Sequence, residues 1–293
     1  MLVFHEKPCL VSNPLDNHHS DEGDRLNVAV MNPVLEEILR TGNTTSTGGE
    51  VIKVHSHIPE EEGESLQEMI LDLRPTVSLE IGLGFGISSL YICEALTKVQ
   101  AERHIIIDPF QHQAWKGNPG WKGIGLLNLK RAGYEKIVEF HDAPSFQVLP
   151  KLQADGLRID FAFIDGWHTF DYVMVDFFYV DKMLRVGGVA VFDDFYYPSI
   201  RKVCRYVLTN LPYHVFPKLA PDVRHRETLK RWLAFNLPGV SKEVRRVTKP
   251  ESLEPDHKLG LRHPKYAALR KEKEDVCGDG SNGTRRWDDH HEF

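Results

Sequence analysis

Three glycines at alternate positions, Gly82, Gly84 and Gly86, are the first residues whose spacing indicates chemistry. They follow an apolar run over 77–81, which predicts a strand, and precede a helical pattern over 88–96. A strand-to-helix turn without side chains lets the backbone approach a ligand at the carboxyl end of a parallel sheet. By itself the turn fits a methyl-donor site, a dinucleotide site or a structural turn about equally well.

Two acids help to choose among these three interpretations of the turn. Glu80 directly precedes the turn, where its charge could face the positive amino group of an amino-acid moiety; a pyrophosphate would gain nothing from it. Asp108 ends the next apolar run, where a carboxylate accepts hydrogen bonds from ribose hydroxyls, as it also does in dinucleotide-binding proteins. Each acid also has a structural interpretation: neighbouring amides could satisfy Glu80, and Asp108 could form the turn before Pro109.

A second group of acids lies further along the chain. Asp165 follows the apolar run 159–164, and Asp193 and Asp194 follow the run 187–192. If these runs are neighbouring parallel strands, the three carboxylates meet at one edge of the sheet and repel one another unless a cation neutralises them. Such oxygen ligands suit Mg²⁺, Ca²⁺ or Mn²⁺, whereas the alternative is that these aspartates cap the following loops and helices.

The elements that must position these residues follow from the alternation of short apolar runs with helical patterns. This rhythm predicts an α/β, Rossmann-like fold with a seven-stranded, mostly parallel sheet and helices on both faces. After residue 211 the rhythm changes, and the runs 214–216 and 232–235 predict a terminal antiparallel hairpin. The other expected strands are 77–81, 104–108, 136–140, 159–164 and 187–192.

Composition and patterning also bound the organisation of the chain. We expect a partly irregular N-terminal extension over 1–50, with a short helix over 33–40 and a loop over 43–49. A catalytic domain follows over 51–247, and then a polar, mobile tail over 248–293 with a short helix near 266–273.

The chain has 293 residues and a net charge of −6, which argues against a nucleic-acid partner. Four cysteines without paired spacing indicate reduced thiols and a cytoplasmic protein. We find no signal peptide and no run of about 20 apolar residues, so we expect no membrane partner. A homodimer is the default for a soluble oligomer.

Three segments carry a resemblance to a known family. The segment 79–89, LEIGLGFGISS, resembles motif I of class I S-adenosylmethionine-dependent methyltransferases. The segments 161–172, FAFIDGWHTFDY, and 187–194, GGVAVFDD, are the more specific part. They resemble the catechol O-methyltransferase-like group and, more closely, the small-molecule O-methyltransferases of antibiotic and sugar pathways. The resemblance covers about residues 58–240.

The resemblance implies a cofactor site for S-adenosylmethionine. Glu80 would hold the methionine amino group, and Ser88 would reach the methionine carboxylate. Ser145 would contact adenine, and Trp167 would stack on it, although a partly buried core aromatic is an equally good interpretation of Trp167. The implied cofactor-binding set is Glu80, Gly82, Gly84, Gly86, Ser88, Asp108, Ser145, Asp165 and Trp167.

The resemblance also implies which residues bind the methyl acceptor. In the resembled families the positions of Asp165, Asp193 and Asp194 bind a divalent metal, here expected to be Mg²⁺. His168 stands where catechol methyltransferases have a lysine that removes the acceptor's proton, and a histidine could do the same near neutral pH. The structural alternative for His168 is a helix-entry histidine bonded to backbone.

The predicted function is therefore metal-assisted O-methyl transfer to a hydroxyl of a small molecule, with Asp165 and His168 as the catalytic pair. A nicotinamide-dependent oxidoreductase of the Rossmann class remains an alternative, although it leaves Glu80 and the Asp193–Asp194 pair unexplained. The same fold also serves hydroxylase-like and aminopropyl-transferring proteins, and it could hold the cofactor without turnover.

Overall fold

The computed structural model describes residues 31–114, 119–216, 256, 259–261 and 265–274. Contacts divide the chain into a unit of residues 1–30, which lies outside the described residues, and a unit that begins at Met31. Everything below concerns the second unit. In the part of the chain that the structure describes, no helix combines the length and the apolar character needed to cross a membrane.

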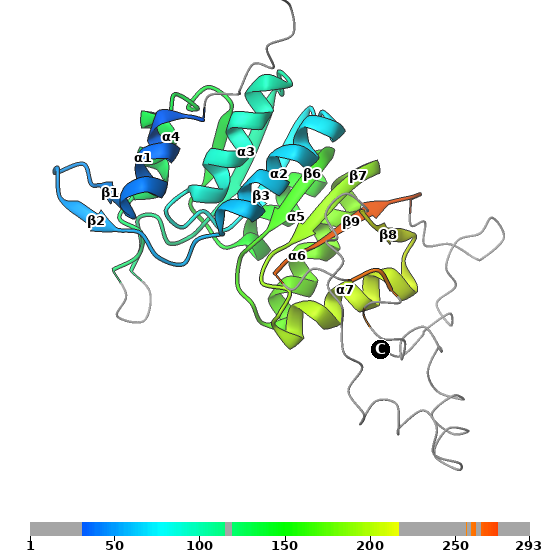
Figure 1. Ribbon diagram of the computed structural model, residues 1–293. Coiled ribbons are helices and arrows are strands. Elements are labelled where there is room, and N and C mark those ends of the chain that lie inside the picture. Colours follow the sequence, from blue (N-terminus) through cyan, green and yellow to red (C-terminus); the bar gives the residue numbers. More distant parts are fainter. Residues whose placement is uncertain (1–30, 115–118, 217–255, 257–258, 262–264, 275–293) are drawn as a thin grey trace, which may run out of the picture. The chain divides into compact units, whose positions relative to one another are not determined.

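A seven-stranded sheet forms the centre of this unit, with the order β5-β4-β3-β6-β7-β9-β8 (Figure 1). Five strands pair in parallel, and β9 runs antiparallel to both of its neighbours. The predicted fold class is therefore confirmed. The strands are β3 (Val77–Ile81), β4 (Arg103–Ile107), β5 (Val138–His141), β6 (Ile159–Ile164), β7 (Leu184–Phe192), β8 (Tyr213–Val215) and β9 (Ala267–Lys271).

Helices cover both faces of the sheet, and each face has its own apolar cluster. Successive residues of a strand point to opposite faces, so Phe163 joins one cluster and Ile164 the other. This is why the central strands are continuous apolar runs. One cluster includes α1 (Pro33–Thr41), α2 (Glu60–Leu73), α3 (Ile87–Lys98) and α4 (Ile124–Arg131); the other includes α5 (Ser145–Ala154), α6 (Phe170–Met183) and α7 (Pro198–Asn210).

The antiparallel part of the sheet corrects one expectation and leaves another untested. The predicted strand over 232–235 lies outside the described residues, and the helix expected near 266–273 is wrong, because Ala267–Lys271 form β9 between β7 and β8. The charges that made this segment resemble a tail are satisfied within the sheet. The buried Lys271 donates to the carbonyls of Asp181 and Leu184, at 2.7 and 3.0 Å. Part of the expected tail therefore belongs to the domain.

Residues 31–50 are also more regular than expected. The helix α1 is confirmed: Asn32 caps it by accepting a hydrogen bond from Val34, and Leu35 and Ile38 are buried. The expected loop over 43–49 instead contributes β1 (Asn43–Thr45), which pairs with β2 (Val51–Lys53) in a separate two-stranded sheet. The core therefore begins with α1, because its apolar side packs against the same cluster as α3.

Candidate active site

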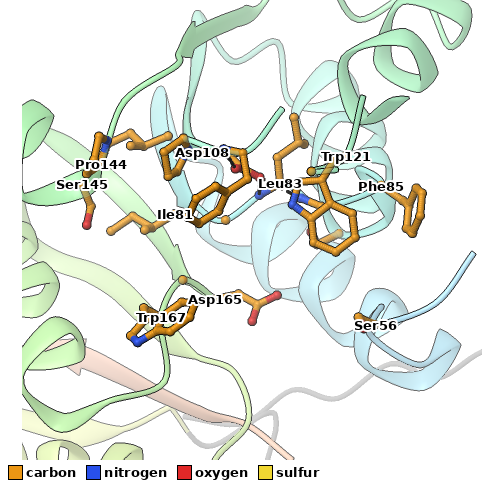
Figure 2. Close-up of a pocket in the computed structure, with 18 of the residues that line it drawn as sticks. Ser56, Ile81, Leu83, Phe85, Asp108, Trp121, Pro144, Ser145, Asp165 and Trp167 are labelled. Carbon is orange, nitrogen blue, oxygen red and sulfur yellow. Dashed lines mark hydrogen bonds between the residues drawn. The ribbon is translucent and has the colours of Figure 1, made fainter. Parts of the chain in front are cut away.

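A cavity of about 680 Å³ opens at the carboxyl ends of β3, β4 and β6. One wall is the glycine turn after β3, and another is the segment 165–168 after β6. Figure 2 shows Asp108 and Leu83 on one side of the space, with Asp165 and Trp167 facing them. Pro144 and Ser145 lie at one end of the picture and Phe85 and Ser56 at the other. The cavity is thus elongated between two chemically different ends.

The glycine turn has the backbone that its sequence predicts. All three glycines have positive φ angles: 95° at Gly82, 54° at Gly84 and 80° at Gly86. A Cβ atom on Gly82 would lie 2.0 Å from the carbonyl oxygen of Asp165, so no side chain fits where the ends of β3 and β6 approach each other. Gly86 caps α3, whose first turn carries Ser88 into the cavity wall.

The turn-forming interpretation of Asp108 is confirmed, whereas its contact with a ribose stays a prediction. Asp108 lines the cavity, and its Oδ2 atom accepts hydrogen bonds from the amides of Leu83 and Gly84, each at 3.0 Å. Its Oδ1 atom accepts from the amide of Phe110 at 2.7 Å. The carboxylate therefore fixes the glycine turn and also forms part of the wall that the turn faces.

Glu80 does not lie where a direct contact with a cofactor amino group requires it. Its side chain is fully buried and absent from the cavity wall. The carboxylate accepts hydrogen bonds from the hydroxyls of Ser88 and Ser89 and lies 2.9 Å from Nε2 of His104. The pleat of β3 explains the difference, because it directs Glu80 to the face beneath α3, where these partners lie. Glu80 ties the start of α3 to β3 and β4.

Ser145 and Trp167 form the end of the cavity opposite Phe85. Ser145 is the first residue of α5 and lines the cavity. Trp167 is 38% exposed and lines the cavity, so it is not a core residue. These two side chains, together with Pro144, offer a flat apolar surface with one hydroxyl, which suits a heteroaromatic ring.

The structure brings together Asp165, His168 and Asp194, of which Asp165 and His168 line the cavity. The Nε2 atom of His168 lies 3.4 Å from Oδ1 of Asp165 and 2.8 Å from Oδ2 of Asp194. One potential ligand atom from each of the three residues lies within 4.8 Å of the others. Burial lowers the pKa of His168, but its hydrogen bonds to the two carboxylates outweigh this and raise it to about 10. The imidazole is therefore a cation whose charged partner is Asp194, since burial and the charge of Asp193 raise the pKa of Asp165.

Asp193 is not part of this cluster, which corrects the three-aspartate set. Its side chain is 8% exposed, and Oδ1 accepts from the amide of Asp194 at 2.6 Å. It also hydrogen-bonds to Glu62 of α2. Asp194 has a φ of 53°, a left-handed conformation that aspartate tolerates. Consecutive side chains at the end of a strand point in different directions, so only Asp194 reaches His168.

Glu62 is a site residue that the sequence analysis missed. It is 2% exposed, and burial, followed by the charge and hydrogen bond of Asp193, raises its pKa to about 10. A protonated Glu62 can donate to Asp193. A signal existed in the sequence: Glu62 shares the apolar face of its helix with Leu66, Met69 and Ile70, where an acid needs a partner.

The wall near Phe85 consists of residues to which the sequence assigned no role. Residues 56–58 line the cavity with Trp121, and the His55 ring lies 5.0 Å from Phe85 and 5.8 Å from Trp121 between centroids. These residues come from the segment before α2 and from the loop before α4. They have no local motif, because only tertiary packing brings them to the glycine turn.

Comparison with known proteins agrees with this geometry. Residues 79–195 match a methyltransferase-domain family. The match spans the glycine turn, Asp108 and the acids after β6 and β7. Residues 79–195 are therefore similar in sequence to a methyltransferase domain. The oxidoreductase alternative receives no support.

Individual relatives are distant. The chain is 25% identical to the catechol O-methyltransferase of Bos taurus over 158 residues, covering 53% of this chain and 54% of that protein. It is 26% identical to a flavonoid 3',5'-methyltransferase of Vitis vinifera, covering 47% and 55%. The chain thus spans about half the length of these relatives. An O-methyltransferase from Bacillus cereus, solved in complex with SAH, is 18% identical with a TM-score of 0.49, covering 62% of this chain and 82% of that one.

Proposed function

We propose that the protein transfers the methyl group of S-adenosylmethionine to a hydroxyl of a small molecule, assisted by a divalent cation, with Mg²⁺ the expected ion. The observation that carries this proposal is a single cavity lined both by the glycine turn and by Asp165 and His168. A donor on the turn and an acceptor beside His168 would share one space. The S-methyl sulfonium is already electrophilic, so alignment is the main task of the protein.

The cofactor's parts are assigned by the chemistry of each wall. Ser145 and Trp167 would hold the purine, and Asp108 would hold the ribose. Ser88, which the buried Glu80 holds in place through a hydrogen bond, would contact the amino-acid part. Glu80 thus acts on the cofactor through Ser88 and the start of α3.

The acceptor end fits a divalent cation on the chemistry of its donor set. Asp165 and Asp194 converge on one cation already, the His168 imidazolium, and together they offer carboxylate oxygens of the kind that Mg²⁺ and Mn²⁺ prefer. When bound, such a cation supplies Lewis acidity that lowers the pKa of an acceptor hydroxyl. Asp193 accepts a hydrogen bond from the amide of Asp194, and Glu62 in turn interacts with Asp193.

His168 is the proposed base, on one condition. With a pKa of about 10 it is protonated at neutral pH and cannot accept a proton. Its pKa depends on the hydrogen bonds to Asp165 and Asp194, so it falls when those carboxylates are shared with another positive charge. The ring stays in place, because Tyr197 stacks on it at 5.2 Å between centroids with a 19° interplanar angle.

The proposal is tested by following the labelled methyl group of S-adenosylmethionine with and without Mg²⁺. Vicinal phenols are the first acceptors to try, since the relatives named above are catechol and flavonoid methyltransferases, and hydroxyl groups of glycosides come next. We expect transfer to oxygen that EDTA suppresses. Cofactor binding without transfer to any hydroxyl of a broad panel would count against O-methyl transfer.

Removing both carboxylates that face His168 should eliminate cation binding. We expect Asp165→Asn/Asp194→Asn to lose measurable Mn²⁺ affinity in calorimetric titration, while Asp193→Asn, which removes a supporting partner, weakens it roughly tenfold. Asp171→Asn, a fully exposed carboxylate at the start of α6, is the matched control and should bind like the wild type. If Asp193→Asn loses as much Mn²⁺ affinity as the double variant, Asp193 is a third ligand. If the double variant keeps the wild-type affinity, no cation binds at Asp165 and Asp194.

The His168 imidazolium also predicts a pH-dependent stability. Its pKa of about 10 in the folded protein lies above the ordinary value of 6.5, so its stabilising contribution is complete below pH 6.5 and is lost as the pH rises toward 10. In EDTA, the melting temperature of the wild type should therefore fall more steeply over this interval than that of His168→Gln. Parallel curves for the two proteins, measured by scanning calorimetry at pH 6, 8 and 10, would contradict the ion pair.

A further inference from the structure

The proposed mechanism does not use one amide side chain that lies in the core. Asn128 belongs to α4 and is fully buried, and a buried amide costs stability unless its polar atoms find partners. Its Nδ2 atom donates a hydrogen bond to the carbonyl of Phe85 at 2.9 Å. Its Oδ1 atom accepts one from the hydroxyl of Thr44 at 2.6 Å. The side chain therefore joins residues that lie 43 and 84 positions away from it along the chain.

These two hydrogen bonds allow only one orientation of the Asn128 amide. A carbonyl oxygen can only accept a hydrogen bond, so the Asn128 atom that faces Phe85 must be the nitrogen. The amide oxygen then faces Thr44, whose hydroxyl donates to it. A rotated amide would place two acceptors against each other at Phe85. The direction of both bonds thus follows from the chemical groups that take part.

Phe85 belongs to the glycine turn, and α4 packs directly against this turn. A Cβ atom on Gly125, three residues before Asn128, would lie 2.6 Å from the carbonyl oxygen of Gly84. The backbone of α4 can approach the turn this closely only because Gly125 has no side chain. Gly84 and Phe85 line the cavity, whereas the described cavity wall does not include Asn128. Asn128 therefore holds the wall from behind.

Thr44 connects the same amide to the two-stranded sheet. It is the middle residue of β1 and is 1% exposed, and β1 pairs with β2. Residues 56–58, which follow β2, line the cavity together with Phe85. One buried side chain thus connects the glycine turn with the strand pair that leads into another part of the cavity wall.

We propose that Asn128, oriented by Thr44, is a positioning residue that holds the Phe85 carbonyl, so that the glycine turn keeps the shape required by the amino-acid part of the methyl donor. This part would run along the turn toward Ser88, whereas the purine would lie at the opposite end of the cavity, beside Trp167. Asn128 therefore acts on one end of the donor only. The inference rests on the proposed placement of the parts of S-adenosylmethionine.

The test compares two ligands that differ in the amino-acid part, S-adenosylhomocysteine and 5'-methylthioadenosine, by calorimetric titration of the whole chain. Asn128→Leu removes the hydrogen bond to Phe85 with little change in side-chain size. The affinity for S-adenosylhomocysteine should fall roughly tenfold, the size of one hydrogen bond. The affinity for 5'-methylthioadenosine, which lacks the amino-acid part, should stay near the wild-type value. An equal loss for both ligands, or no loss for either, would overturn the positioning role.

Val207→Ala is the control for a loss of stability alone. Val207 is buried on α7 in the other apolar cluster, and the described cavity wall does not include it. Its truncation leaves a cavity in the core, so the melting temperature should fall. The ratio of the two ligand affinities should nevertheless match the wild type. If Val207→Ala changes this ratio as Asn128→Leu does, the ratio reports stability and Asn128 has no positioning role.

Thr44→Val tests the connection to β1. It removes the hydroxyl that orients the amide, so it should weaken S-adenosylhomocysteine binding less than Asn128→Leu does. Adding it to Asn128→Leu should lower the affinity no further, because the two residues act through one hydrogen-bonded chain. If the two losses simply add, Thr44 does not act through Asn128. If the wild type binds neither ligand, the cofactor assignment itself is wrong, which separates that failure from failure of the inference.

Discussion

Gly82→Ala should destroy the donor site and destabilise the domain. The new Cβ atom would lie 2.0 Å from the carbonyl oxygen of Asp165, and the φ of 95° is itself unfavourable for alanine. The left-handed backbone costs about 1–2 kcal/mol, and forcing apart the ends of β3 and β6 adds about 1–3 kcal/mol. Because the same shift displaces Asp165, we expect loss of measurable S-adenosylhomocysteine binding together with a lower free energy of unfolding.

Gly156→Ala separates the cost of the left-handed backbone from the cost of the clash with Asp165. Gly156 has a φ of 77°, but a Cβ atom there would meet nothing within 4 Å. It should therefore show the backbone cost alone and bind the ligand normally. Urea unfolding and calorimetric titration of both variants measure the difference. Equal destabilisation in the two, with ligand binding intact in Gly82→Ala, would mean that the approach of β3 to β6 is not needed for the site.

His168→Ala should produce the largest loss of turnover. General-base catalysis contributes roughly 10²–10⁴-fold, and kcat should fall by this amount while the Kd for S-adenosylhomocysteine changes little. The reason is that His168 lies at the acceptor end, between Asp165 and Asp194, whereas the purine and amino-acid walls lie elsewhere in the cavity. Turnover is measured with the labelled methyl donor at saturating concentration.

His214→Ala is the control for this variant. His214 pairs with Glu272 at the exposed end of the sheet, and the described cavity wall does not include it. Its replacement should leave kcat unchanged. Undiminished turnover in His168→Ala would place the base elsewhere, and a parallel loss of ligand affinity would indicate that His168 holds the fold of the site instead of accepting a proton.

The parallel half of the sheet was predictable because its physical signal is local. Strands such as Ile159–Ile164 are buried on both faces and therefore appear as unbroken apolar runs between helical patterns. The strand β9 was not predictable in this way. Arg270 and Lys271 resemble a solvated segment in the sequence, because their partners come from distant elements: the carbonyls of Gly187 and Leu184 in β7 and of Asp181 in α6.

The same contrast between local sequence signals and tertiary contacts applies to the residues of the candidate site. The glycine turn, Asp165 and His168 are continuous motifs, and the structure brings them to one cavity. The directions of Glu80 and Asp193 depend on the pleat and on partners from α2 and α3, which no local pattern contains. Glu62 reaches Asp193 across about 130 positions of sequence, so only its place on an apolar helix face could have indicated it.

The central claim is that the cavity between the ends of β3 and β6 holds a methyl donor. Calorimetric titration of the whole chain with S-adenosylhomocysteine and, separately, with NAD⁺ tests it most directly. We expect one S-adenosylhomocysteine bound per chain, lost in Gly82→Ala and retained in Gly156→Ala, with no binding of NAD⁺. Binding of NAD⁺ without binding of S-adenosylhomocysteine would contradict it.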